Sequence, residues 1–278
     1  MEWIITIIIV ASLLIAGLIV WTILSNVLLK TTNYDIKSEK LPTTFDGFKI
    51  AHVSDFHNDK KLGEKLVCAI KKSLPDIIVI TGDLIDSRKT NTVVAINFIS
   101  KITEIAPIYY VVGNHESRIS EYKSLEKDLL SLGVKVLRNK KEEILRNNGK
   151  LVIAGVDDPN FNKTTKNEAY VMDKTLQSLD LTDDFNIVLS HRPELFEVYA
   201  THKADVVFCG HAHGGQFRVF GRGLYAPQQG FFPRFTSSVH EKNSTSMVVS
   251  RGISNSAFPF RFNNCPELVI VTIKHKKN

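Results

Sequence analysis

The chain has 278 residues, a formal net charge of +6 and three cysteines, none in a Cys-x-x-Cys pair. This length fits one α/β domain with a large core, and an odd, scattered set of cysteines excludes a disulfide framework. The basic residues are dispersed and form no stripe, which argues against a nucleic-acid partner and favours an anionic membrane surface or anionic substrates.

The chain begins with a long apolar segment. No charged residue occurs from Trp3 to Leu29, and about 20 apolar residues suffice for a helix that crosses a bilayer. We therefore expect an uncleaved transmembrane anchor over residues 1–30. The alternative is a cleaved signal peptide, which would need a basic start and a small-residue cleavage site. Lysines follow the segment and none precedes it, which predicts a single-pass protein of the cell membrane with its main domain on the cytoplasmic face.

The rest of the chain begins with a polar connector, expected over residues 31–47. Apolar runs that indicate buried strands then alternate with segments of helical periodicity. The predicted helices cover Gly63–Ser73, Thr92–Glu104, Ser120–Leu132 and Val171–Leu179. The predicted strands are Phe48–Val53, Asp76–Ile80, Pro107–Val112, Val134–Leu137, Glu143–Leu145, Leu151–Ala154, Phe185–Leu189, Val206–Cys209, Met247–Ser250 and Leu268–Ile273. This alternation predicts βαβ units and a mostly parallel α/β fold.

Five of the predicted strands end in aspartate, asparagine or histidine. Function in parallel sheets gathers at the carboxyl ends of strands, so we expect these side chains to meet. The predicted set is Asp55, His57, Asp83, Asn114, His191, His211 and His213, with His115 beside it.

This set contains carboxylates, an amide and imidazoles, and no thiolate. Oxygen and nitrogen ligands of this mix suit manganese, iron or zinc. Seven side chains exceed the need of one ion, whereas two ions about 4 Å apart and bridged by one carboxylate use them all. Such a pair of ions clamps a phosphoryl group and activates water for in-line attack.

The ordered motifs resemble those of a known family, the calcineurin-like metallophosphoesterases. The motifs are Asp55-Phe56-His57, Gly82-Asp83, Gly113-Asn114-His115-Glu116, His191 and Gly210-His211-Ala212-His213. The stretches Gly210–Gln216, Leu224–Pro227 and Ser250–Asn255 further resemble the membrane-associated YaeI/YkuE-type branch. That branch includes phosphodiesterases and relatives that cleave the pyrophosphate of UDP-diacylglucosamine.

The resemblance implies a four-layer α/β/β/α sandwich, two mixed β-sheets flanked by helices, as a catalytic domain over residues 48–278. It implies two divalent metal ions, with manganese first and iron or zinc as alternatives, and a hydroxide between them as the nucleophile. His115 would stabilise or protonate the leaving group. The implied ligands are Asp55, His57 and His213 for one metal, Asn114, His191 and His211 for the other, and Asp83 as the bridge.

The function that follows is hydrolysis of a phosphodiester by a membrane-anchored enzyme. One alternative is a pyrophosphatase of a lipid-linked nucleotide such as UDP-2,3-diacylglucosamine. An alternative of another class is a non-catalytic, phosphate-binding scaffold at the membrane, against which the complete ligand set argues.

Glu116 stands where aspartate is also common in the family, and this small departure is not expected to matter. Two further features have more than one interpretation. Asp86 could orient a metal ligand or cap a helix. Residues 214–262 interleave aromatic side chains with arginines, either as an apolar wall for a lipid-linked phosphate or as ordinary core with solvated arginines. Within this stretch, Arg251 is the predicted substrate-binding residue.

Overall fold

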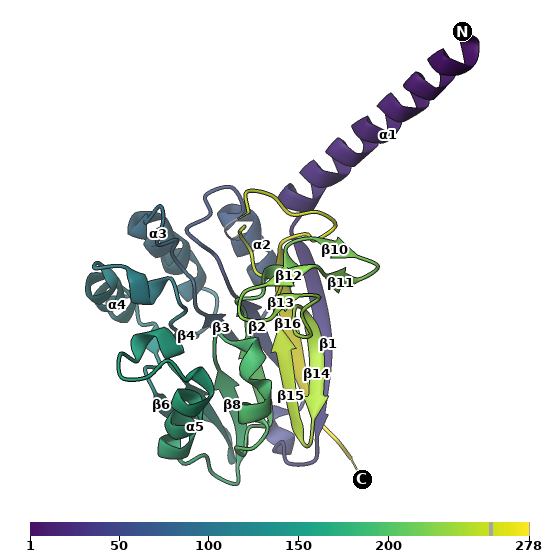
Figure 1. Cartoon of the computed structure of the whole chain (residues 1–278). Helices are drawn as coiled ribbons and strands as arrows, with labels where there is room; N and C mark the ends of the chain where they lie inside the picture. Colours follow the sequence, from purple (N-terminus) through teal and green to yellow (C-terminus); the bar gives the residue numbers. More distant parts are fainter. Residues whose placement is uncertain (256–257, 278) are drawn as a thin grey trace.

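A computed structural model gives the structure of residues 1–255 and 258–277 (Figure 1). Its α-helices are α1 (Glu2–Val27), α2 (Gly63–Ser73), α3 (Thr92–Thr103), α4 (Tyr122–Ser131), α5 (Glu168–Leu179) and α6 (Phe196–Tyr199).

Two six-stranded sheets form the body of the molecule. The first has the order β1 (Lys30–Ser38), β16 (Glu267–His275), β2 (Phe48–Val53), β3 (Ile77–Thr81), β4 (Ile108–Val111) and β5 (Lys135–Val136). The second has the order β14 (Ser238–Lys242), β15 (Thr245–Val249), β9 (Val206–Cys209), β8 (Phe185–Leu189), β7 (Gly149–Gly155) and β6 (Lys140–Arg146). Both sheets are mixed, since β16 runs antiparallel to β2 and the outer pairs of the second sheet are antiparallel.

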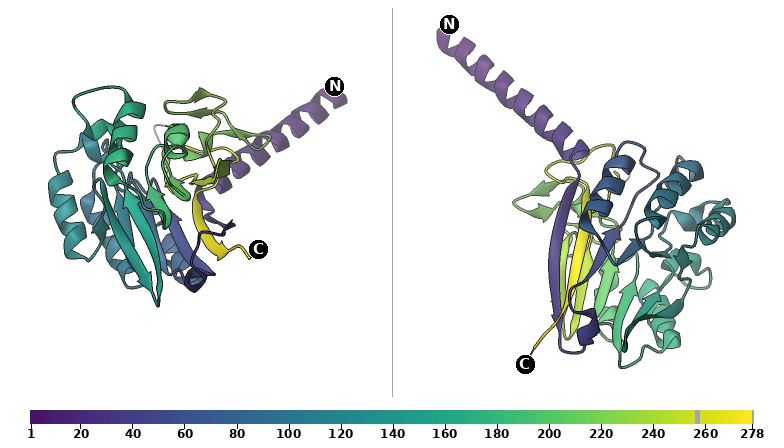
Figure 2. Two further views of the ribbon diagram at one scale, coloured as in Figure 1. Left: turned by 90° about the horizontal axis from the view of Figure 1, so that it is seen from below. Right: turned by 180° about the vertical axis from the view of Figure 1, so that it is seen from behind.

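The two sheets pack face to face, and helices cover their outer faces (Figures 1 and 2). Side chains alternate along β2: Ile50 points into the core between the sheets, whereas Ala51 and Val53 join α2, α3 and α4 in an outer core. A third core lies between the second sheet and α5 and α6. Because the central strands are buried on both faces, they read as continuous apolar runs. The predicted four-layer α/β/β/α fold is confirmed.

The prediction of a polar connector over residues 31–47 is wrong. Residues 30–38 form β1, which pairs in parallel with β16 at the edge of the first sheet. The connector reading arose because β1 is largely solvent-exposed, so that its sequence is polar apart from Tyr34 and the buried Ile36. Leu41 and Phe45 then enter the core between the sheets. The folded domain therefore starts at the end of α1.

The helix α1 projects away from the domain in every view (Figures 1 and 2). It has 26 residues and is long and apolar enough to cross a membrane. Only its last turns contact the domain. The Asn26 side chain donates to the carbonyl of Arg261 at 2.9 Å and accepts from the Arg261 amide at 2.8 Å. The Ser25 hydroxyl accepts from the amide of Asn263 at 3.1 Å. These bonds fix the end of α1 to the segment before β16.

Two small hairpins that the sequence did not indicate follow β9. They are β10 (Arg218–Val219) with β11 (Arg222–Gly223), and β12 (Tyr225–Ala226) with β13 (Gly230–Phe231). The β10–β11 hairpin lies beside the domain end of α1 (Figures 1 and 2).

Candidate metal centre

Buried side chains from five strand ends meet between the two sheets. Parallel pairing of β2, β3 and β4, and of β8 and β9, brings the carboxyl ends of these strands together. Three groups of the described side chains come close enough to hold a metal ion, and one of them, His57, Asp86 and His115, is partly exposed. The two fully buried groups are Asp55, His57, Asp83 and His213 as the first, and Asp83, His191 and His211 as the second. Asp83 belongs to both groups, so its carboxylate is placed as a bridge.

In the first group two histidines face the Asp55 and Asp83 carboxylates. His213 Nε2 lies 3.2 Å from Asp55 Oδ1. His57 Nε2 lies 3.7 Å from Asp83 Oδ2 and 3.9 Å from Asp55 Oδ1. Among the described residues, neither buried ring nitrogen of His57 has a hydrogen-bond partner. A buried imidazole without a partner is costly, and coordination to a cation would remove that cost.

In the second group several ligand atoms converge on His191 Nε2. It lies 3.2 Å from Asp83 Oδ2, 3.1 Å from His211 Nδ1 and 3.2 Å from Asn114 Oδ1. Lone pairs that approach this closely repel one another unless a proton or a cation lies between them. The arrangement therefore fits a second cation held by these four side chains.

Hydrogen bonds hold the outer nitrogens of the clustered histidines. The side-chain amide of Gln228 lies 2.6 Å from His211 Nε2. His191 Nδ1 donates to the Thr81 carbonyl at 2.7 Å, and His213 Nδ1 to the Ser254 carbonyl at 3.1 Å. Metal-binding histidines commonly donate their second N–H in this way, which orients the ring and leaves the inner lone pair for the ion. The residues present therefore fit two metal ions.

The charges of the site also favour a bound cation. Burial lowers the pKa of His57 and of His213 to about 3, so both imidazoles are neutral, as ligands must be. Burial would raise the pKa of Asp83, but the charge of His191 outweighs it and holds that pKa well below its ordinary value. Burial would also lower the pKa of His191, and Asp83 in turn raises it to about 10. A proton on His191 thus supplies positive charge that a divalent ion would supply instead.

The backbone at the site is held in an uncommon conformation. Five of the clustered residues have positive φ: Asp55 (53°), His57 (45°), Asp83 (51°), His211 (64°) and His213 (45°). The left-handed region costs a residue other than glycine about 1–3 kcal/mol, and such outliers gather at functional sites. Glycines allow the loops to approach one another, since a Cβ on Gly113 would lie 2.3 Å from Asp83 Oδ1 and one on Gly210 would lie 2.5 Å from Asp55 Oδ2.

Comparison with known proteins decides the family. The pattern of the calcineurin-like phosphoesterase family matches residues 48–215. The metallophosphoesterase YkuE of Bacillus subtilis is 30% identical over 265 residues, which cover 89% of this chain and 86% of YkuE. The chain belongs to the calcineurin-like phosphoesterase family.

Two further matches extend this result. A Danio rerio transmembrane protein with a metallophosphoesterase domain is 25% identical over 256 residues, which cover 88% of this chain and 57% of that protein. The crystal structure of TT1561 from Thermus thermophilus has the same fold, with a TM-score of 0.53 and 17% identity over 74% of this chain and 90% of that one. The resemblance to this family and to its YkuE-type branch is thus confirmed, and with it a hydrolase with a dinuclear site for divalent metal.

His115 of this phosphoesterase lies at the rim of the metal centre. Its Nδ1 accepts from the backbone amide of Ser87 at 2.9 Å and lies 3.5 Å from Asp86 Oδ1. Because Nδ1 accepts that amide, the proton of the neutral ring is on Nε2, which lies 3.9 Å from Asp83 Oδ2. Asp86 does not cap a helix. Its carboxylate lies beside His115 Nδ1 and forms an ion pair with Arg88.

Glu116 connects two loops of the site, a role that the sequence did not indicate. Its buried carboxylate accepts four backbone N–H groups, from Asp83 (3.0 Å), Leu84 (2.8 Å), Ile85 (3.3 Å) and Gly113 (2.7 Å). The first three belong to the loop after β3 and the fourth to the loop after β4. One side chain therefore ties together the two loops that carry Asp83 and Asn114.

The sequence also gave no sign of a buried charge network behind His211. The guanidinium of Arg192 is fully buried, forms a bidentate ion pair with Asp158 and lies 3.5 Å from His211 Nε2. These residues come from separate loops, and no local pattern joins them.

A cavity of about 290 Å³ opens onto the metal centre. Its wall includes His115, the two arginines Arg88 and Arg118, and the aromatic side chains of Tyr225 and Phe258. Arg251, the predicted substrate-binding residue, is not in this wall. It forms an ion pair of 2.8 Å with the buried Glu267, and the described cavity takes its arginines from the loops after β3 and β4 instead.

Proposed function

We propose that this phosphoesterase hydrolyses phosphodiesters at a membrane surface with two divalent metal ions, of which manganese is the first candidate and iron and zinc are alternatives. The observation that carries the proposal is the pair of buried ligand groups that share Asp83, next to a cavity lined by His115. When bound, the two ions would supply an activated water and neutralise the charge of the phosphoryl group.

The side chains around the cavity have separate roles in this proposal. Asp55, Asp83 and the clustered histidines hold the ions. Arg88 and Arg118 give the cavity positive charge that attracts the phosphate and orients its oxygens. Because the Ser87 amide occupies Nδ1, His115 Nε2 carries the N–H of the neutral ring and would donate a hydrogen bond to the departing oxygen. That hydrogen bond would stabilise the negative charge that develops on the leaving group.

The membrane anchor is part of the proposal. In support, α1 meets the length and apolarity of a spanning helix, and relatives of this chain are named transmembrane proteins. Lys60, Lys61 and Lys65 lie in a groove against the last turns of α1, where Lys65 Nζ donates to the carbonyl of Val27 at 3.1 Å. Together with Lys30, they place positive charge at the domain end of the helix, which favours the cytoplasmic face of the cell membrane.

A pyrophosphatase of a lipid-linked nucleotide remains the alternative within the same chemistry. The aromatic side chains of Tyr225 and Phe258 in the cavity wall favour a substrate with an apolar part. The third candidate, a scaffold that binds phosphate without chemistry, is opposed by the complete ligand set.

The full chain in detergent micelles tests the proposal. The protein is stripped of metal and then resupplied with manganese, iron or zinc, and hydrolysis of bis(p-nitrophenyl) phosphate is compared with that of p-nitrophenyl phosphate. We expect turnover to return with metal, to favour the diester, and to fall about 10²–10³-fold in His115→Ala, the usual effect of losing one hydrogen-bond donor to developing negative charge. His202→Ala is the matched control, because His202 pairs with Asp173 outside the cavity.

Two results would contradict the proposal. Unchanged turnover in Asp83→Asn would show that the shared carboxylate is dispensable, which a bridging ligand cannot be. Metal bound in the wild type, with no hydrolysis of either ester or of a nucleotide pyrophosphate carrying acyl chains, would favour the scaffold.

A further inference from the structure

We infer that the tip of the β10–β11 hairpin and residues 258–260 form a second contact with the bilayer, which holds the mouth of the metal cavity at the membrane surface for amphiphilic phosphodiesters. This inference rests on the proposed anchor and names the substrate class of the same site.

The first observation is the exposure of apolar side chains at this surface. Phe220, at the tip of the hairpin, is 100% exposed, and its neighbour Val219 is 48% exposed. Phe258 and Phe260 are 46% and 44% exposed. Both predicted readings of residues 214–262 are therefore incomplete, since only some of its aromatic side chains are core or cavity wall. Clustered exposed aromatics mark an interaction surface.

The second observation is that this surface is continuous with the end of α1. The Ser25 hydroxyl accepts from the Asn263 amide, and the Asn263 side chain donates to the Arg218 carbonyl of β10 at 3.2 Å. A further bond of 3.0 Å joins the Arg218 amide to the carbonyl of Phe262. The hairpin is thus tied to the last turns of the helix, and Figures 1 and 2 show it at the level where α1 leaves the domain. A bilayer that surrounds α1 would meet the hairpin first.

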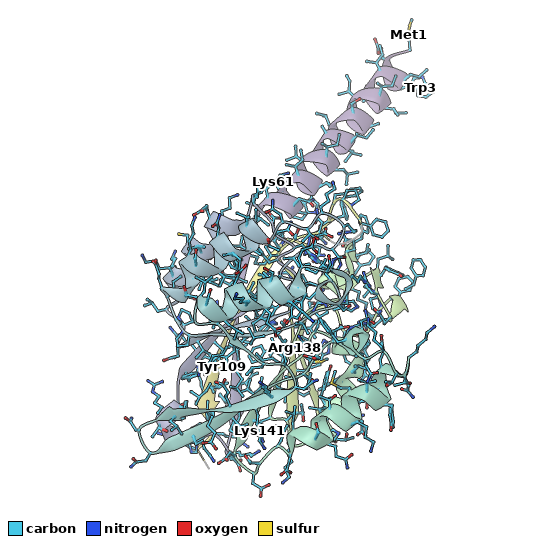
Figure 3. All side chains as sticks on the ribbon, turned by 90° about the vertical axis from the view of Figure 1, so that its left-hand side faces the viewer. Met1, Trp3, Lys61, Tyr109, Arg138 and Lys141 are labelled. Atoms are coloured by element: carbon cyan, nitrogen blue, oxygen red, sulfur yellow. The ribbon has the colours of Figure 1, made fainter. Side chains whose placement is uncertain are left out.

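The third observation is the charge around the helix end. Lys60, Lys61 and Lys65 line a groove with Asn26 and Phe260. Figure 3 shows Lys61 next to the domain end of α1, whereas Lys141 lies at the far side of the molecule. Aromatic side chains flanked by lysines suit the boundary between anionic headgroups and acyl chains. This combination identifies the occupant as a lipid surface rather than a second protein.

The surface also reaches the metal cavity. Phe258 belongs both to the exposed aromatic set and to the cavity wall, where Tyr225 lies with it. An amphiphile in the adjacent leaflet could therefore place its phosphate at the metal centre while its acyl chain follows these aromatic side chains. The substrate class is a phosphodiester with one apolar ester group.

A depth measurement on the full chain tests the contact without any need for activity. The two tryptophans, Trp3 and Trp21, both lie in α1, so replacement of both by phenylalanine gives a background without tryptophan. Phe220→Trp in this background, reconstituted in anionic vesicles, is exposed to lipids spin-labelled near the headgroup. We expect at least about twofold quenching, because interfacial apolar side chains enter the bilayer by about 5–10 Å. Leu145→Trp on β6, also exposed, is the control and should not be quenched.

Lack of quenching at position 220 would overturn the inference. A variant that keeps only Trp21 separates the causes: quenching there without quenching at position 220 leaves the anchor standing, and no quenching at either position removes the anchor as well.

A kinetic comparison tests delivery of the substrate. The double variant Val219→Ser/Phe220→Ser should hydrolyse bis(p-nitrophenyl) phosphate as the wild type does. It should lose about tenfold in kcat/KM on hexadecyl p-nitrophenyl phosphate in vesicles, because the apolar contact is gone. Equal rates of variant and wild type on the vesicle substrate would refute delivery by this surface.

Discussion

Replacement of Glu116 by glutamine tests how the metal centre is held in shape. In the native protein each carboxylate oxygen accepts two backbone N–H groups, from Asp83 and Gly113 at Oε2 and from Leu84 and Ile85 at Oε1. Glutamine offers one oxygen and one NH₂ group. Whichever way the amide turns, two backbone N–H groups face another donor and lose their acceptor.

The expected loss follows from these contacts. A hydrogen bond to a charged group contributes about 1.5–3 kcal/mol, so two of them amount to about 3–6 kcal/mol. Because glutamine carries no charge, the variant avoids the free-energy cost of a buried charge, which offsets part of this loss. We expect a net loss of about 2–4 kcal/mol in the free energy of unfolding. For a domain of this size that corresponds to a fall in Tm of about 5–15 °C. Activity should fall about tenfold to a hundredfold, because displacement of Asp83 or Asn114 by about 1 Å is enough for such an effect.

The assay is thermal unfolding and diester hydrolysis at saturating metal. Glu116→Asp keeps the charge on a shorter side chain and should lie between the wild type and Glu116→Gln. Glu121→Gln, at the exposed position that precedes α4, is the control and should change neither quantity. If Glu116→Gln melts within about 1 °C of the wild type, a shift that corresponds to well under 1 kcal/mol, the loops do not depend on this carboxylate.

Three more predictions follow from buried charge and metal. Removal of metal by a chelator should lower Tm, and resupply should restore it in proportion to metal concentration, because ligands that bind only the folded state stabilise it; a Tm indifferent to metal would contradict the ligand assignment. Asp158→Asn should cost about 3–5 kcal/mol in urea unfolding, since it leaves the Arg192 charge buried without its main partner; a loss below 1 kcal/mol would show that Glu194 compensates. Burial lowers the pKa of His52 to about 3 from 6.5, so the unfolded chain binds the proton more tightly and stability falls as pH drops below 6.5. His52 should contribute about 2 kcal/mol of this loss at pH 5, and His52→Gln should show a correspondingly smaller loss between pH 7 and pH 5.

The sequence predicts well those elements that are buried on both faces. The structure has the predicted bounds for the strands β2, β8 and β9 and for the helix α2. For the strands the reason is that a strand covered on both sides must be apolar throughout. The strand β1 was missed for the opposite reason: it lies at an edge, and solvent allows its polar side chains. The β10–β11 hairpin makes contacts with Phe262 and Asn263, which lie far along the chain.

The clustering of the predicted aspartate, asparagine and histidine side chains could be predicted because each of them follows a strand, and parallel strands bring their ends together. The residues that support these side chains could not be predicted from the sequence. Glu116 acts by folding back onto amides of a loop 30 residues earlier, and Gln228 meets His211 from a hairpin without periodicity. The substrate contact of Arg251 stays a prediction. This arginine pairs with Glu267, and an arginine before a glycine carries no signal that distinguishes a substrate contact from such an ion pair.

The position of β16 has a consequence for biogenesis. This strand lies between β1 and β2, so Thr32 and Glu267, which share a hydrogen bond, are 235 residues apart in sequence. A ribosome that has already released α1 and β1 must translate nearly the whole domain before β1 gains its neighbour. Until then the β2 edge is unpaired, and exposed edges promote aggregation. The first sheet can therefore close only near the end of translation. Asp55, at the end of β2, gains its final surroundings only when the nascent chain is nearly complete.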